Sequence, residues 1–299
     1  MGLFVNEFGQ LYDALLSAYP ALKETAQNHC IYQFSAMPVA PDWPLKGGRS
    51  AIADLSSPTR DGFYQVGAGR VTRAYQSLLS SLDPVRGENL AQEVASALSQ
   101  MENASADVAC DLNADIERWK SLQTPMLNVH VDSSIPCDND WTRLYNGQGG
   151  AGFSTILNGP CRYTFTAQGL GVYTVQRGRW YRERFVTPTF PIAEGGNLTT
   201  ADFFGRGGTL QHVTYRVVVV WKPQVILTLP REALPAFLPG ANSLEENQHP
   251  AGILGLDFNF LQVQILPAAN GMDDDNFSLL LPGGEPLQLW GIQSATHYM

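Results

Sequence analysis

Residues 209–229 read TLQHVTYRVVVVWKPQVILTL, and this stretch carries the longest strand signal in the chain. β-Branched and aromatic residues dominate it, which is typical of β-strands. Val217–Val220 makes both faces apolar, so we expect a central strand with cover on both sides. Because proline cannot donate to a strand ladder, Pro223 predicts a turn, after which Val225–Leu229 returns as the second strand of a hairpin.

The sequence from Leu127 onward alternates with a period of two and is punctuated by glycine, proline and asparagine. Many short strands separated in this way are typical of a β-sandwich or a jelly roll. We therefore expect residues 126–299 to form an antiparallel β-sandwich or jelly-roll-like domain. The expected strands are residues 127–131, 153–157, 161–167, 171–176, 179–187, 209–221, 225–229, 256–266, 277–281 and 286–292.

The first 125 residues show a helical period instead. Apolar residues recur every three or four positions over about residues 3–18, and again over Val71–Leu82, Leu90–Met101 and Val108–Trp119. Residues 35–69 are rich in proline, glycine and serine, which predicts a long irregular connection. The expected fold class is therefore α+β, with a helical N-terminal domain over residues 1–125 followed by the β-rich domain over residues 126–299.

Charge is distributed unevenly along the chain, whose net charge is −9. Residues 1–125 contribute −5, residues 126–231 contribute +4, and residues 232–299, which contain no lysine or arginine, contribute −8. The overall acidity argues against nucleic acid as a partner. The split predicts oppositely charged surfaces, which either neutralise each other within the fold or meet a protein partner, a glycan or a second copy of the chain.

The apolar runs are all shorter than the roughly 18 residues that a membrane-spanning helix needs. The first residues, MGLFVNEFGQLYDALL, include Glu7 and Asp13 but no lysine or arginine, unlike a secretory signal peptide. We therefore expect no transmembrane segment, and either a cytoplasmic location or export by a route without such a signal. The cysteine pattern leaves open whether Cys137 and Cys161 form a disulfide or stay free thiols.

An arginine-rich segment follows the strand expected at residues 171–176. It contains four arginines and two aromatic residues, namely Arg177, Arg179, Arg182, Arg184, Trp180 and Tyr181. Guanidinium groups beside aromatic rings are typical of sites that bind phosphate, sulfate, nucleic acid or carboxylate groups. We interpret these six residues as a candidate site for an anion or a partner. The alternative is that the arginines pair with the acidic residues of segment 232–299, in the same chain or in a neighbour.

His130 and Asp132 lie two positions apart at the end of an expected strand, so their side chains share one face. With a distant histidine, His212 or His249, they would supply two imidazoles and one carboxylate, a set that binds Fe(II) or another divalent cation. This HxD…H pattern resembles that of the non-haem iron oxygenases, whose jelly roll would match the expected β domain. The chain departs from that family because no arginine follows at the expected spacing, and Lys222 stands there after His212. A hydrogen-bonded His–Asp pair is the alternative.

A second candidate metal site is an acidic loop that contains Asp273, Asp274 and Asp275. Calcium binds such oxygen-rich loops, although the spacing here does not match an EF-hand. Solvated turn residues are the alternative.

The sequence contains no nucleophile elbow, zinc-protease motif or nucleotide-binding loop. We therefore expect a non-catalytic binding or assembly protein, in which the β domain recognises a protein partner, a glycan or a second copy of the chain. A toxin-like pairing of a helical part with a β recognition part is one version of this hypothesis. The alternative is a metal-dependent jelly-roll enzyme that uses His130, Asp132 and His212.

Overall fold

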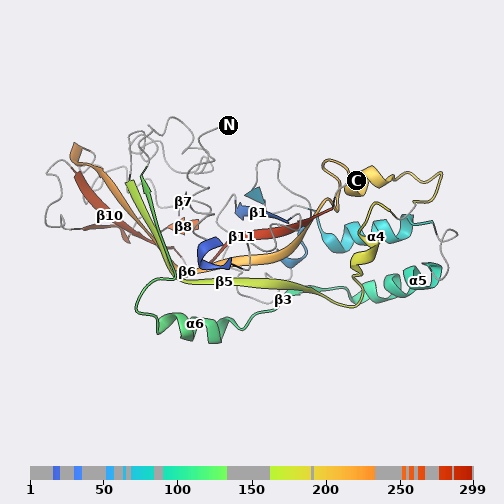
Figure 1. Ribbon diagram of the computed structural model, residues 1–299, viewed down its shortest axis with the longest axis horizontal. Helices are drawn as coiled ribbons and strands as arrows, with labels where there is room; N and C mark the ends of the chain where they lie inside the picture. The colour runs from blue at the N-terminus through green and yellow to red at the C-terminus, as the bar shows by residue number, and fades with distance from the viewer. Residues whose placement is uncertain are drawn as a thin grey trace.

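The computed structural model describes residues 16–20, 30–35, 52–56, 63–64, 69–83, 90–132, 162–189, 192–232, 251–253, 256–258, 262–266, 276–284 and 286–297. These residues form a mixed α+β fold in which one long, mainly antiparallel sheet runs the length of the molecule (Figure 1). Short helices gather at one end of this sheet and below its middle. No helix within these ranges is long and apolar enough to cross a membrane.

The sheet has nine strands in this part of the chain. Its centre is formed by β5 (Arg162–Arg177) and β6 (His212–Pro230), which pair antiparallel. Along the other edge of β6 lie first β11 (Leu287–Thr296) and then β10 (Asn276–Pro282). The outer strands are β1 (Cys30–Ser35) on β11, β2 (Phe63–Tyr64) on β1, β3 (Ala106–Val108) and β4 (Leu127–Asp132) on β5, and β9 (Gln264–Leu266) on β10. A separate pair consists of β7 (Ala251–Ile253) and β8 (Leu256–Phe258).

The central position predicted for Val217–Val220 is confirmed, since these valines are fully buried between β5 and β11. The predicted hairpin is wrong, because β6 continues through Pro223 as a single strand. At this point β6 changes its neighbour from β11 to β10. Lys222 adopts a φ of 47° and its N–H donates to the Pro286 oxygen at 2.5 Å, while the Gly283 N–H donates to the Pro223 oxygen at 2.8 Å. Because Pro223 lies where the ladder changes partner, its missing N–H is tolerated inside a long strand.

The strands predicted over residues 161–167 and 171–176 are joined into one, β5. A Cβ on Gly169, in the middle of β5, would lie 2.2 Å from Cδ2 of Trp119, so glycine leaves room for this indole. The indole packs α6 (Leu112–Lys120) onto the sheet. The strand predicted over residues 179–187 is wrong, because these residues form a turn and the 3₁₀-helix η3 (Glu183–Phe185), with Trp180 and Phe185 buried in the core.

Strands from the first 125 residues also enter the sheet, since β1 pairs with β11 and β3 pairs with β5. The boundary predicted between residues 125 and 126 therefore does not separate the strands of this sheet. The predicted helix over about residues 3–18 lies mostly outside the described ranges. The helical N-terminal domain and the jelly roll remain predictions.

The two helices predicted after residue 70 are confirmed as α4 (Val71–Ser81) and α5 (Leu90–Gln100). The third, α6, begins four residues later than predicted, at Leu112. Asp111 caps it, because its carboxylate accepts a hydrogen bond from the Ala114 N–H at 3.1 Å. Val108, which fits the helical period, lies instead in β3 and pairs with Val175 of β5.

At the other end of α6, β5 holds the helix. Trp119 stacks on Trp221 of β6, with ring centroids 6.3 Å apart. The side-chain amide of Gln168 donates to the main-chain oxygens of Trp119 and Leu122, at 3.2 and 2.9 Å. These bonds reinforce the C-terminal end of α6, where the Trp119 oxygen also accepts from the Leu122 N–H at 3.3 Å. The centre of the sheet and α6 are thereby one packed unit.

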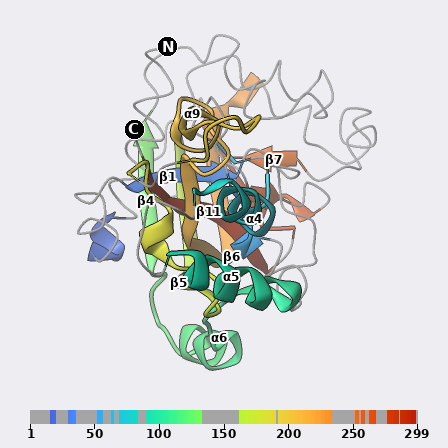
Figure 2. The same cartoon turned by 90° about the vertical axis from the view of Figure 1, so that its right-hand side faces the viewer.

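A second core lies at the helix-covered end of the sheet, which Figure 2 shows from that end. It is formed by α4, α5, α9 (Thr200–Phe204) and the segment that follows β5. Its fully or almost fully buried aromatic side chains are Tyr75, Trp180, Phe185, Phe203 and Phe204. The arginine-rich segment therefore leaves β5 directly over an aromatic core.

Candidate functional site

The arginine-rich segment is held by its aromatic residues. The Tyr75 hydroxyl of α4 accepts a hydrogen bond from the Arg182 N–H at 3.0 Å and donates to the Arg182 oxygen at 3.4 Å. The ring of Tyr75 packs against those of Trp180 and Tyr181, with centroids 5.6 and 5.1 Å apart. The Trp180 indole N–H donates to the Ser105 oxygen at 3.2 Å. Trp180 and Tyr181, predicted as ligand-contacting residues, are therefore placed as anchors of the backbone.

Arg177 points inward. One of its terminal nitrogens donates to the main-chain oxygens of Ala53, at 3.0 Å, and of Thr214. Its guanidinium also lies over the ring of Tyr181, 5.0 Å from the centroid. Burial lowers the pKa of Arg177, and burial raises the pKa of Tyr181 to about 12. Arg177 therefore joins three parts of the chain, and its bonds are made within the fold.

Arg182 and Arg184 share one carboxylate, that of Glu93 in α5. An Arg184 terminal nitrogen forms an ion pair with Glu93 Oε2, and an Arg182 terminal nitrogen lies 3.9 Å from the same oxygen. The Arg184 guanidinium also lies over the ring of Phe185, 5.0 Å from its centroid. The acidic partner seen here thus comes from α5, whereas the sequence pointed to segment 232–299.

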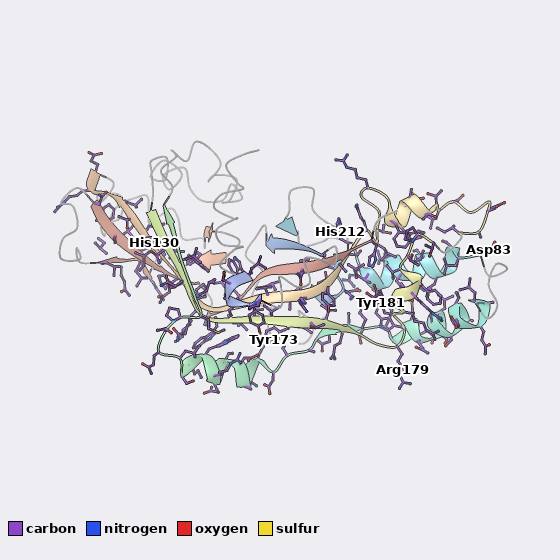
Figure 3. The ribbon with its side chains drawn as sticks, viewed as in Figure 1. Asp83, His130, Tyr173, Arg179, Tyr181 and His212 are labelled. Carbon is purple, nitrogen blue, oxygen red and sulfur yellow. The ribbon has the colours of Figure 1, made fainter. Side chains whose placement is uncertain are left out.

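Arg179 is exposed in the turn between β5 and Trp180 (Figure 3). No ion pair involving Arg179 occurs among the described residues. We call Arg179, Arg182 and Arg184 the arginine surface. All three cations belong to one six-residue segment, residues 179–184, which Trp180 and Tyr181 fix to the core.

The predicted metal-ligand set is not assembled from His130 and His212. His130 lies in β4, where its Nδ1 is 2.7 Å from the hydroxyl oxygen of Thr164 in β5. Thr164 lies opposite Ile226 of β6, fourteen residues from His212, which corresponds to about 45 Å along a strand. Figure 3 shows the two histidines at opposite ends of the sheet.

The remaining metal candidates are only partly within the described residues. Asp132 lies opposite Arg162 in the β4–β5 pair, and no group of three or more metal-ligating side chains occurs in the described ranges. His249 and the loop containing Asp273, Asp274 and Asp275 lie outside these ranges, as do Cys137 and Cys161. The Fe(II) and Ca²⁺ sites therefore remain predictions from the sequence.

The first half of β6 packs against other parts of the chain. By the alternation of a strand, it places His212, Thr214 and Arg216 on one face. The Thr214 hydroxyl donates to the Leu55 oxygen at 2.8 Å, and Arg216 donates to the Gln293 side-chain oxygen at 3.3 Å. Burial lowers the pKa of His212, and the charge that His297 takes up on protonation lowers it further. This face therefore serves as an internal polar contact.

Two contributors to this region lack any clear sequence signal. Residues 52–56 fall in the stretch predicted to be irregular, yet Asp54 accepts hydrogen bonds from the Thr72 N–H at 2.8 Å and the Thr72 hydroxyl at 2.6 Å. His297 follows the last strand, and its N–H donates to the Gln211 oxygen at 2.8 Å. Neither residue belongs to a periodic pattern or a motif, so only the tertiary fold reveals them.

Comparisons of the chain with protein families, with curated proteins and with solved structures give no significant match.

Proposed function

We propose that the chain is a non-catalytic binding or assembly protein whose recognition surface is the arginine surface. The supporting observation is that three guanidinium groups stand on a segment fixed to the core by buried Trp180 and by Tyr181. A segment that is already ordered loses little conformational freedom when it binds, which favours affinity. Arginine is enriched in protein interfaces, because its planar fork matches a carboxylate.

The partner that we expect is a protein surface with clustered carboxylates. Residues 177–184, RGRWYRER, contain four arginines and one glutamate, although the whole chain has a net charge of −9. A basic segment on an acidic protein orients a partner through local complementarity and not through net charge. A second copy of the chain would also qualify, because its residues 232–299 carry a charge of −8.

Fluorescently labelled poly-L-glutamate is a suitable probe for this surface, with binding to the full chain followed by anisotropy at low salt. We expect binding that weakens with added salt, and an affinity about tenfold lower in the double variant Arg179→Gln/Arg184→Gln, which corresponds to roughly 1.4 kcal/mol. The matched control is Arg118→Gln/Lys120→Gln on α6, which changes the net charge equally and removes two exposed cations elsewhere.

Two results would contradict the proposal. One is equal binding of poly-L-glutamate by the two double variants. The other is binding of heparin with no binding of poly-L-glutamate, which would indicate a sulfated glycan as the partner class. Sedimentation velocity at low and high salt then distinguishes a second copy from a different protein, because a salt-sensitive dimer lost in Arg179→Gln/Arg184→Gln requires self-association.

A further inference from the structure

Glu93 occupies part of the arginine surface in the free protein. Its carboxylate, in the first turn of α5, pairs with Arg184 and lies 3.9 Å from an Arg182 terminal nitrogen. The contact is accessible to solvent, since the side chains of Glu93, Arg182 and Arg184 are 33%, 29% and 52% exposed. A partner can therefore reach the same guanidinium groups without unfolding any element.

The chemistry of this contact matches that expected of a partner. Guanidinium groups bind carboxylates through paired, charge-assisted hydrogen bonds, and one carboxylate between two arginines leaves a positive charge unbalanced. Ion pairs at this degree of exposure contribute little to stability, because water and salt screen them. Such a pair can be exchanged for a similar one at low cost.

We propose that Glu93 is an internal competitor, which a carboxylate of the partner displaces from Arg182 and Arg184. This inference rests on the proposed function of the arginine surface. The apparent affinity for a partner is then the intrinsic affinity multiplied by the fraction of molecules in which Glu93 does not occupy the arginine pair. Glu93 would thereby select partners that present several carboxylates over those that present one.

The variant Glu93→Gln tests this inference. It removes the competing charge but keeps the size of the side chain, so we expect it to bind labelled poly-L-glutamate about three- to tenfold more tightly than the unaltered protein. Glu117→Gln is the matched control, because Glu117 also pairs with a cation, Lys120 of α6, at 2.7 Å. The control removes the same charge, and we expect its affinity to change by less than about twofold.

Further variants separate competition from other effects. Combining Glu93→Gln with Arg182→Gln and Arg184→Gln should abolish the gain, since the freed guanidinium groups are then absent. Glu93→Asp, which keeps the charge near the start of α5 but shortens the side chain by one methylene, should give a smaller gain. Circular dichroism and thermal unfolding confirm that each variant is folded.

The outcomes distinguish this inference from the proposed function. If the unaltered protein binds poly-L-glutamate and Glu93→Gln binds no more tightly than Glu117→Gln, the competitor role is refuted and the arginine surface stands. If neither the unaltered protein nor Glu93→Gln binds the probe, both proposals fail. Binding by Glu93→Gln alone would support both, with Glu93 as a strong competitor.

Discussion

The guanidinium of Arg177 donates a hydrogen bond to the main-chain oxygen of Thr214, and so joins the end of β5 to the start of β6. The direct pairing of these strands ends where Thr174 lies opposite Arg216. Beyond that point β5 pairs with β3. Val213 of β6 no longer lies beside β5, and forms an antiparallel bridge with Ser56 instead. Arg177 spans the opening between the diverging strands, with its second bond to Ala53 in the inserted segment.

Replacing Arg177 by methionine should therefore destabilise the fold. The change removes two hydrogen bonds from a charged donor, and each such bond contributes roughly 1.5–3 kcal/mol, so we expect a loss of about 3–6 kcal/mol in the free energy of unfolding. Urea denaturation measures it. Arg177→Lys should recover only part of the loss, because lysine lacks the planar fork. A stability of Arg177→Met within about 0.5 kcal/mol of the unaltered protein would show that the bridge is not needed.

Gly169 offers a test of the packing of α6. A Cβ at this position would lie 2.2 Å from Trp119 Cδ2, so Gly169→Ala must displace the indole or the strand. We expect a loss of about 1–3 kcal/mol in unfolding free energy, together with a change in tryptophan fluorescence. Gly196→Ala is the control, since its Cβ would lie 3.5 Å from the nearest atom, the Ala193 oxygen. Equal stabilities for the two variants would be inconsistent with this packing.

The Tyr173 hydroxyl should contribute to the attachment of α6 by a polar contact. It donates to Asp115 Oδ2 at 2.6 Å, and burial together with this hydrogen bond raises the pKa of Tyr173 above its usual range. Tyr173→Phe should cost about 1–3 kcal/mol of unfolding free energy, as expected for a partly buried bond to a charged group. A double-mutant cycle with Asp115→Asn measures the coupling, and a coupling energy near zero would contradict the role of this contact.

The two histidines at the end of the β6–β11 pair predict how stability depends on pH. Burial lowers the pKa of both His212 and His297 from the usual value of 6.5, so the folded state favours their neutral forms. Below about pH 6.5 the unfolded chain binds more protons than the folded chain, and stability falls until the folded-state pKa values are passed. The slope per histidine cannot exceed about 1.4 kcal/mol per pH unit.

Thermal unfolding between pH 8 and pH 5 checks this dependence. The midpoint temperature should fall on the acidic side, and His212→Gln should reduce the slope. His130→Gln serves as the control, because His130 is exposed in β4. An unchanged slope in His212→Gln would mean that other groups cause the acid sensitivity.

Burial can be predicted from the sequence where it follows a local period. The 3.6-residue repeat correctly predicts that Tyr75, Leu78 and Leu79 of α4 are buried, and the apolar run correctly places Val217–Val220 at the centre of the sheet. The turn predicted at Pro223 is wrong because the local rule, that proline interrupts a ladder, does not reveal where the ladder is already interrupted. That position depends on Pro286 and Gly283, which lie some sixty residues further along the chain.

The candidate site shows the same division. The sequence identifies the arginines, but it cannot show that Arg177 is turned inward towards Thr214 while Arg179 is exposed. It also cannot identify Glu93 as the acidic partner, because this contact joins α5 to a segment about ninety residues away. The register of β4 and β6 separates His130 from His212, and spacing along a sequence carries no information on register.

The position of β6 has a consequence for the order in which the protein is made. During translation β6 emerges before β10 and β11, so one edge of β6, which includes its apolar valine run, stays unpaired until residues 276–296 have left the ribosome. β1 stays without its partner strand for longer still, because it precedes β6 in the chain and pairs with β11. An unpaired apolar edge invites association with other nascent chains, so this protein should depend on chaperones while it is being synthesised.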